Sequence, residues 1–581
     1  MPDARWLYLG RDVRFLHEVR NLIGGHMLEQ SYGEKLQAIA HEKRADYIEY
    51  LGRLASGLDP LFWWLTSISE KNPNNSRFFL YSCYVNLVIE EIQLDPCDMI
   101  ILCETQGLAR TIEKNIADRP DIVLKCQGFS RKAILNSAGN TIIGIAKKIH
   151  LIVSMTSRIL LSRILSLARP GNTLRGTGAM IFSWADARSF ASLSYTDIYC
   201  GALGNQLRKR GERVTYLVSI LPTFPFLEGL VSLWKFRREV LLAEEFLHPW
   251  DPLLAWFRVW RNRQEPKEIP PMAGIDVSGI VEEELLKERF SVARERAFLF
   301  FLIGRNLAGY SDFSIFIHPF ENHAWEKMFA ISLKRYSPSV KVIGYLHSIA
   351  MPMYTCESMS SWEREHGPHP DLILVNGPGA KATLIESGFD ANAIHVGGSF
   401  REFSIRPDRI ASGKKIKDRI LLPLAADLNE ALELVYLTLE AVSEMPWISV
   451  MIKAHPIIKP GELRRSLPTL PLSIRLCGES TQDLLADTDL VLYTSSTVAV
   501  EAFAMGIPVI HVGSNLNIDR NIFEGLAWVP SASKARDLGL AISQALGKEE
   551  GTEGGRRALI ESLFSPIDGK IMDRLVEWNF A

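Results

Sequence analysis

The chain has 581 residues, of which 47% are apolar, and 65 Lys and Arg nearly balance 67 Asp and Glu. This length exceeds what one hydrophobic core supports, so we expect roughly three to four structural units. The composition is typical of a globular protein and argues against disorder and against wholesale nucleic-acid binding. The seven cysteines include no CxxC pair, so neither a disulfide framework nor a zinc site is expected. The first residues lack a signal-peptide pattern, which favours the reducing cytoplasm.

Residues 1–170 contain one clear predicted strand, Met99–Cys103, among mostly helical patterns, and we expect an accessory N-terminal domain of undefined topology. Apolar residues recur at helical spacing over 142–169, while Lys147, Arg158 and Arg169 return to one helical face. This pattern predicts a basic amphipathic helix. Such a helix either packs on a core, which the pattern favours, or lies on an anionic membrane surface. Every window of 18 residues carries charge, so a spanning helix is not expected.

From residue 176 onward, short apolar runs alternate with helical stretches, as in a parallel α/β sheet. We expect a Rossmann-like domain over 176–400, with a helical insertion at about 221–295. This insertion mixes Trp and Phe with Arg and Lys, which suits a bilayer interface and equally suits a helical cover over a core. The predicted strands of this domain are 179–184, 213–220, 313–317, 340–345 and 372–375.

A second α/β series follows the basic stretch 401–417, which has the composition of a linker. We expect a Rossmann-like domain over 415–546 and a terminal helical segment over 556–581. Because ligands bind at the carboxyl ends of parallel strands, two such domains are expected to enclose a binding cleft. The predicted strands are 419–424, 448–453, 473–476, 489–493 and 508–512.

Two strand ends of this last domain carry polar groups. The strand 448–453 ends in Lys453, and Pro456 stops the strand, so that His455 can face the cleft; a structural histidine is the alternative. The strand 489–493 is followed by Thr494, Ser495, Ser496 and Thr497 at the start of a helix. Free backbone N–H groups there favour an anion. One helix cap needs one hydroxyl, so the run predicts a phosphate site.

Glu501 lies one turn after Thr497 on the same helical face, where it can accept hydrogen bonds from ribose hydroxyls; a surface carboxylate is the alternative. The loop with Asp427, after the first strand of the domain, reaches the same edge.

The motifs KAHP (453–456) and TSSTVAVEA (494–502) resemble those of the GT-B-fold glycosyltransferases of bacterial surface polysaccharides, and in particular the sialyltransferase and Kdo-transferase groups. The resemblance covers about residues 176–545. It implies two Rossmann-type domains facing a cleft, with His455 and Pro456 at the CMP of an activated sugar and Ser495, Ser496 and Thr497 at its phosphate. It also implies transfer of a nonulosonic-type sugar to a glycan such as lipopolysaccharide, capsule or O-antigen. The acidic Asp/Glu-Asp/Glu-Gly motif of such enzymes is absent from residues 176–545, the part that the resemblance covers.

Inverting transfer needs a base that takes the proton of the acceptor hydroxyl. Glu321 and then Asp186 are the favoured candidates, because each follows a predicted strand of the middle domain; a helix cap or surface carboxylate is the alternative for both. Glu104 is a third candidate. Asp487 and Asp489 imitate a metal-binding DxD but lie at the amino end of their strand, so we expect metal-independent chemistry without a cofactor besides the donor. Signatures of ATP hydrolysis, zinc proteolysis and NAD chemistry are missing from the sequence.

The expected partners are a nucleotide-sugar donor, a glycan or lipid-linked glycan acceptor and the cytoplasmic face of an inner membrane, with no nucleic acid. Four alternatives stay open at this point. The chain can be a UDP- or GDP-sugar transferase, a sugar-nucleotide epimerase, a CDP-polyol phosphotransferase of the same fold, or a non-catalytic scaffold of polysaccharide assembly that docks through 221–263.

Overall fold

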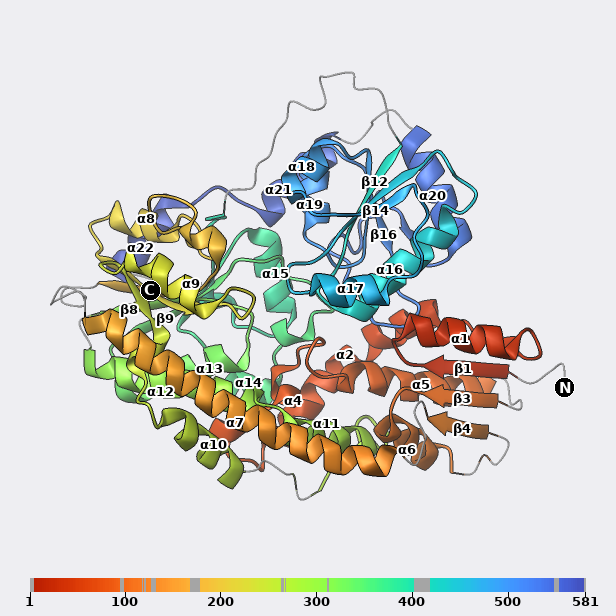
Figure 1. Ribbon diagram of the computed structural model, residues 1–581, viewed down its shortest axis with the longest axis horizontal. Coiled ribbons are helices and arrows are strands. Elements are labelled where there is room, and N and C mark those ends of the chain that lie inside the picture. Colours follow the sequence, from red (N-terminus) through yellow and green to blue (C-terminus); the bar gives the residue numbers. More distant parts are fainter. Residues whose placement is uncertain are drawn as a thin grey trace.

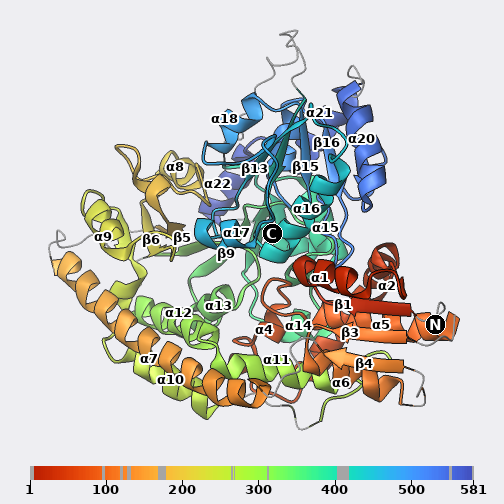
Figure 2. The same ribbon diagram turned by 45° about the vertical axis from the view of Figure 1, so that its right-hand side comes forward.

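The computed structural model describes residues 5–94, 99–117, 119, 122–126, 132–167, 178–262, 266, 268–310, 313–401, 418–547 and 553–578. Three parallel sheets organise the chain, one each in an N-terminal lobe (5–126), a middle domain (178–401) and a third domain (418–547). Figures 1 and 2 show the three units grouped around a common junction. The expected pair of Rossmann-type parallel-sheet domains is confirmed. The linker expected at 401–417 lies, after residue 401, outside the described residues.

The N-terminal lobe has its own parallel sheet in the order β2-β1-β3-β4. The sequence predicted only β3. Strand β2 is two exposed residues long and β4 is partly exposed, whereas β1 was missed although it is as long as β3 and mostly buried. The order reverses between β1 and β3, which creates a crevice at their carboxyl ends. The strands are β1 (Arg5–Leu9), β2 (Leu28–Glu29), β3 (Met99–Cys103) and β4 (Ile122–Cys126), and the helices are α1 (Val13–Ile23), α2 (Gly33–Ala55), α3 (Pro60–Trp63), α4 (Ser67–Glu70), α5 (Phe78–Leu94) and α6 (Gln106–Asn115).

The middle sheet has the order β11-β10-β9-β8-β5-β6-β7 and reverses between β5 and β8. The predicted helical insertion also supplies the edge strand β7, which the sequence analysis missed. The strands are β5 (Ala179–Ala185), β6 (Val214–Ile220), β7 (Val240–Leu242), β8 (Ile315–Pro319), β9 (Lys341–Leu346), β10 (Leu372–Val375) and β11 (Ile394–Val396). The helices are α8 (Leu203–Arg208), α9 (Phe226–Trp234), α10 (Asp251–Arg261), α11 (Ser278–Phe290), α12 (Ala293–Leu307), α13 (Ala324–Tyr336), α14 (Ser361–His366) and α15 (Pro378–Glu386).

The third sheet has the order β14-β13-β12-β15-β16-β17 and reverses between β12 and β15. Its strands are β12 (Arg419–Pro423), β13 (Ser449–Lys453), β14 (Ile474–Cys477), β15 (Leu490–Tyr493), β16 (Val509–Val512) and β17 (Ser531–Ala532). Its helices are α16 (Leu428–Ala441), α17 (Pro460–Ser466), α18 (Thr481–Ala486), α19 (Val498–Ala504) and α20 (Ala535–Gly547). The chain then returns to the middle domain through α21 (Glu553–Leu563), which contacts both α15 and α19, and α22 (Gly569–Glu577), which packs on α8.

The long helix α7 (Lys132–Leu167) connects the lobe to the middle domain and runs beside α10 in both views (Figures 1 and 2). The predicted helix over 142–169 therefore exists, and its last two residues lie outside the described part. Among the described helices, its segment Thr141–Leu167 is the one long and apolar enough to cross a membrane by length and composition. The segment nevertheless packs on the protein, since Leu151, Ile159 and Leu165 are buried.

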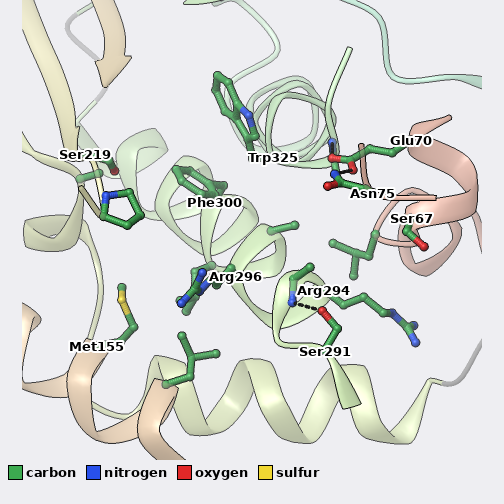
Figure 3. A pocket seen from close by; sticks show the side chains of 18 of the residues that line it. Ser67, Glu70, Asn75, Met155, Ser219, Ser291, Arg294, Arg296, Phe300 and Trp325 are labelled. Carbon is green, nitrogen blue, oxygen red and sulfur yellow. Dashed lines mark hydrogen bonds between the residues drawn. The ribbon is translucent and has the colours of Figure 1, made fainter. Parts of the chain in front are cut away.

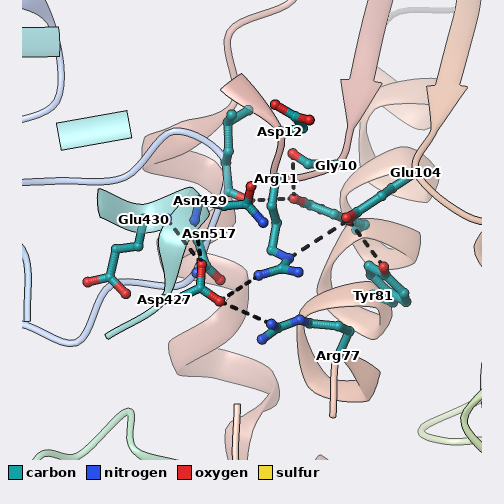
Figure 4. A network of polar contacts seen from close by, with 12 residues as sticks. Gly10, Arg11, Asp12, Arg77, Tyr81, Glu104, Asp427, Asn429, Glu430 and Asn517 are labelled. Atoms are coloured by element: carbon teal, nitrogen blue, oxygen red, sulfur yellow. Dashed lines mark hydrogen bonds and ion pairs between the residues drawn. The ribbon is translucent and has the colours of Figure 1, made fainter. Parts of the chain in front are cut away.

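The N-terminal lobe is joined to the other two units by buried charge. The ammonium group of Lys71 lies 2.5 Å from a carboxylate oxygen of Glu363, and that of Lys327 lies 3.2 Å from the other oxygen. Although burial opposes ionisation, these two lysines lower the pKa of Glu363 to about 2. Toward the third domain, Asp427 accepts hydrogen bonds from Arg11 at 3.0 Å and Arg77 at 3.1 Å (Figure 4). The lobe is thus an integral part of the assembly.

Candidate functional site

The predicted donor residues lie at one edge of the third sheet. Strands β13 and β15 both pair with β12, so the tips that carry His455 and Thr494 are two strand spacings apart, about 10 Å. The ammonium group of Lys453 donates to the carbonyl of Glu479, beyond β14, and therefore turns away from β15. His455 is partly buried, and its burial lowers the pKa of its imidazole. Pro456 lies next to it in the same loop.

The hydroxyl run after β15 is not used as a helix cap. Thr497 occupies the N-cap position of α19 without a side-chain hydrogen bond to the helix. The Thr494 side chain is buried, and its hydroxyl has no hydrogen-bond partner among the residues that the structure describes. The Ser495 hydroxyl donates to Glu430 at 2.5 Å, while Ser496 is half-buried. The loop therefore holds one buried hydroxyl that the described residues leave unsatisfied, and the anion site stays a prediction.

Two residues of this edge were missed by the sequence analysis. Glu430, in the first turn of α16, is only 6% exposed and forms an ion pair with Arg520, which is 8% exposed. A local sequence pattern could have identified Glu430, because it stands three residues after the N-cap Asp427, in the spacing of a capping box. No local sequence pattern points to Arg520, because its partner Glu430 is 90 residues away in the sequence.

Glu321 follows β8 and lies between two imidazoles. One carboxylate oxygen is 3.4 Å from Nδ1 of His323, and the other is 3.7 Å from Nε2 of His347. Burial lowers the pKa of His347 to about 4, so this ring is neutral near pH 7. Burial also opposes protonation of His323, but the carboxylates of Glu321 and Glu70 raise its pKa overall. A partly exposed carboxylate held between two imidazoles is suited to accept a proton.

The backbone beside Glu321 is strained. Asn322 has a φ of 59°, a conformation uncommon for a residue with a side chain and found disproportionately at functional sites. It is held there because Glu326 accepts the backbone N–H groups of Glu321, Asn322 and His323 at 3.0 to 3.2 Å. Glu321, His323 and Glu326 have side-chain ligand atoms within 4.8 Å of one another, a grouping able to hold a metal ion. The Glu326 oxygens are engaged with the backbone, and metal independence stays a prediction.

The other two carboxylates considered as the base have structural partners. Asp186 caps the short helix at 187–190, and both of its oxygens accept hydrogen bonds from the Arg188 side chain. Glu104 accepts a hydrogen bond from the Tyr81 hydroxyl at 3.1 Å and belongs to the network in Figure 4. The geometry thus leaves Glu321 as the best-placed candidate. Asp489, which belongs to the DxD-like pair Asp487/Asp489, accepts the backbone N–H of Arg419 at the amino end of β12. This is the end of the sheet at which the sequence analysis expected it.

The two sheet edges approach each other through Tyr354 and Arg401. The ring centroid of Tyr354 lies 5.9 Å from the guanidinium carbon of Arg520. Burial raises the pKa of its hydroxyl, and the charges of Glu321 and Arg520 act on the same group. Burial likewise raises the pKa of Glu501, and the charge of Arg401 opposes this effect while also acting on His347. Glu321 and the hydroxyl loop therefore flank one junction.

A cavity of about 690 Å³ runs along the carboxyl edge of the middle sheet. Its walls come from the ends of β5 and β6, from helices α7, α11 and α12, from the start of α13 and from the N-terminal lobe (Figure 3). Trp325, two residues after His323, forms part of the lining. This volume is in the usual range of small-molecule sites.

No family model matches the chain, and no curated protein matches its sequence. Solved structures with a similar arrangement include the Anabaena protein HepE in complex with UDP and glucose, with 12% identity and a TM-score of 0.39 over 69% of this chain and 98% of that one. The UDP-GlcNAc 2-epimerase from Methanocaldococcus jannaschii has 11% identity and a TM-score of 0.40 over 69% of this chain and 100% of that one. The glycotransferase of kitacinnamycin has 14% identity and a TM-score of 0.40 over 70% and 100%. Similarity at this level does not assign an activity to this chain.

Proposed function

We propose that the protein is a glycosyltransferase that uses a nucleotide-activated sugar. The observation that carries this proposal is the junction itself, where Glu321 lies between two imidazoles opposite a loop with an unpartnered buried hydroxyl, Thr494. Each group follows a strand next to a point of strand-order reversal, the place where open α/β sheets bind ligands. One edge then holds the acceptor and the other holds the donor.

The chemistry is a single displacement. Glu321 takes the proton of an acceptor hydroxyl as its oxygen attacks the anomeric carbon of the donor sugar. The bond between that carbon and the phosphate oxygen breaks, and the phosphate leaves with the electron pair. Hydroxyls and backbone N–H groups of the 494–497 loop receive the charge that develops on the phosphate. His323 and His347 orient the Glu321 carboxylate.

For the donor we propose a CMP-linked nonulosonic sugar, such as Kdo or a sialic-acid relative, bound at His455, Pro456, Ser495, Ser496, Thr497 and Glu501. The resemblance of KAHP and TSSTVAVEA to the CMP-sugar transferases supports this choice, as does their position at one sheet edge. A UDP- or GDP-sugar, or a CDP-polyol, would use the same edge. An epimerase would need several acid-base groups around the sugar and no acceptor cavity. The scaffold alternative predicts weak nucleotide binding or none.

A thermal-shift panel of CMP, CDP, UDP and GDP tests the donor. At 100 times Kd a bound nucleotide stabilises the folded protein by about 2.7 kcal/mol. We expect the largest shift with CMP or CDP, and we expect His455→Ala to remove it. His366→Ala, at the exposed end of α14, is the matched control. A larger shift with UDP or GDP contradicts the CMP assignment, and no shift with any nucleotide supports the scaffold.

We also propose that the protein attaches to the cytoplasmic face of an anionic membrane. Exposed apolar side chains of α7, α9 and α10, which contact one another through α7, form the surface that we call the apolar face. Its aromatic and basic composition suits a bilayer interface. The apolar face comprises Ile142, Ile145, Ile149, Val153, Leu160, Ile164, Leu227, Val231, Trp234, Trp250, Leu253, Trp256, Phe257 and Trp260.

Co-sedimentation with phosphatidylglycerol-containing vesicles tests the attachment. The double variant Ile149→Asp/Val153→Asp is expected to bind at least tenfold more weakly, because two charges then face the hydrocarbon boundary. Leu472→Asp, at a fully exposed leucine of the third domain, is the control and is expected to bind normally. Equal binding by all three proteins would exclude the apolar face as the contact.

A further inference from the structure

Helix α7 exposes many apolar residues on its outer side, and its inner side carries charged residues beside the buried Leu151, Ile159 and Leu165. The outer side of α7 forms part of the apolar face defined above and includes the exposed Ile149 and Val153. Its inner side carries charge, because Lys148 pairs with the buried Glu295, and Arg158 lies 2.6 Å from a carboxylate oxygen of the buried Glu244. The sequence left open which face of this helix meets the protein. Of its predicted basic residues, Lys147 is exposed and Arg158 turns inward to Glu244. The charged inner side borders the cavity described above.

The cavity combines an apolar wall with cationic groups. Met155 of α7 and Phe300 of α12 face each other across it, and Trp325 closes one end (Figure 3). Arg158, Arg294 and Arg296 contribute guanidinium groups to the lining. Further apolar lining comes from Leu65, Leu151, Trp184, Leu247, Leu299 and Ile303.

Arg296 differs from the other charged groups of the lining. Within the described part of the chain, its guanidinium group has no hydrogen-bond or ion-pair partner, and Figure 3 shows it among the lining side chains. Arg296 is exposed to solvent at the cavity wall, and partial desolvation together with the neighbouring charge of Arg158 lowers its pKa. An anion bound beside the two guanidinium groups would offset their mutual repulsion. Each nearby carboxylate has at least one oxygen engaged elsewhere: Glu244 with Arg158, Glu284 with Lys287, Glu288 with Ser67, and Glu70 with Asn75. The second oxygens of Glu244 and Glu288 are buried without a hydrogen-bond partner among the described residues.

From this combination we propose that the cavity binds an amphipathic phosphate, with the phosphate group at Arg296 and its apolar chain against Met155 and Phe300. A guanidinium group without an acceptor matches a phosphate oxygen pair, and the apolar wall excludes water from the chain. This inference rests on the proposed function, for which it assigns the acceptor to the class of lipid-linked phosphates.

The position of the cavity fits that role. Its far end is lined by Ala324 and Trp325, which directly follow His323 in the chain, and by Glu70, which accepts the backbone N–H of Ala324 at 3.0 Å. A sugar carried on the phosphate at Arg296 would extend toward this end, beside Glu321. The outer side of α7 would meanwhile lie on the bilayer that supplies the lipid.

Calorimetric titration of the full chain tests the proposal in the absence of nucleotide. The probe is decyl phosphate below its critical micelle concentration. Decyl maltoside, which has the alkyl chain without the charge, and inorganic phosphate, which has the charge without the chain, are the two comparison ligands. We expect saturable binding of decyl phosphate alone, at least tenfold weaker in Arg296→Gln and largely retained in Arg296→Lys. Arg258→Gln, on the exposed side of α10 and outside the cavity, is expected to bind like the parent protein.

Several outcomes would overturn the site. These are no saturable binding of decyl phosphate, equal binding by Arg296→Gln, decyl maltoside binding as tightly as decyl phosphate, and inorganic phosphate binding as tightly as decyl phosphate. Because no nucleotide is present, these results are independent of the donor thermal-shift panel. A protein that binds decyl phosphate but no nucleotide would keep the cavity site and lose the transferase assignment.

Discussion

The carboxyl edges of the middle and third sheets share a topology and differ in chemistry. Both sheets reverse their strand order after their first strand, so each has a crevice at the corresponding place. The middle edge carries Glu321 between imidazoles and an apolar cavity. The third edge carries hydroxyls and one buried ion pair, Glu430 with Arg520. The shared topology thus provides two places for ligands, and the loops decide which ligand each one suits.

The largest expected effect tests whether the edge of the middle sheet supplies the catalytic base and concerns Glu321. Glu321→Gln removes the proposed base while keeping its shape, and loss of a general base typically costs about 10²- to 10⁴-fold in turnover. We expect a loss of that size in an assay of sugar transfer, with the CMP-induced thermal shift unchanged.

Asp186→Asn is the matched control for Glu321→Gln. Asp186 is held by Arg188 and by its own helix start, so we expect less than about a fivefold change in turnover, since no proton transfer is lost. If the two variants lose activity equally, Glu321 is not the base.

A second test concerns the neutral imidazole of the middle edge. Because the folded pKa of His347, about 4, lies below the ordinary value, its contribution to stability is present above the ordinary pKa and is lost as the pH falls toward 4. Between pH 7 and pH 4 the unfolding free energy of the parent protein should fall, relative to His347→Asn, by on the order of 3 kcal/mol. Urea unfolding at both pH values measures this difference. His366→Asn, at an exposed ring, should track the parent protein, and a pH-independent difference for His347→Asn would contradict its burial as a neutral ring.

The smallest expected effect is at the third edge. Thr494→Val replaces a buried hydroxyl that has no hydrogen-bond partner in the described part of the chain by a methyl group of similar shape. The free protein should lose no stability, while the nucleotide should bind about fivefold more weakly, because one hydrogen bond contributes about 1 kcal/mol. Thr438→Val provides the contrast, since that hydroxyl already donates to the Leu434 carbonyl at 2.8 Å. It should cost stability and leave nucleotide binding unchanged, and the opposite pattern would remove Thr494 from the donor site.

Alternation of apolar runs and helices predicted most strands of the two larger sheets, because buried parallel strands leave a strong apolar signal. The short edge strands β7 and β17 and the partly exposed β4 lack that signal. Strand ends also predicted Glu321 and the hydroxyl loop as candidates. The end of the strand that carries His347 was a candidate for the acceptor side, but the contact of His347 with Glu321 and the role of Arg520 were not predicted, because long-range contacts leave no local pattern. The orientation of α7 was left open for a related reason: periodicity reveals two faces of a helix but does not show which of them meets the protein.

The buried ion pairs of the N-terminal lobe limit how this molecule can move. Lys71 ties the lobe to Glu363 of the middle domain, and Arg11 ties it to Asp427 of the third domain. Opening the two domains like a clamshell would strip partners from charges that are out of water, which is costly. We therefore expect substrates to pass through the junction by local loop movements within a rigid frame. Removal of residues 5–126 would leave Glu363 with Lys327 as its remaining lysine and would take both arginine partners from Asp427.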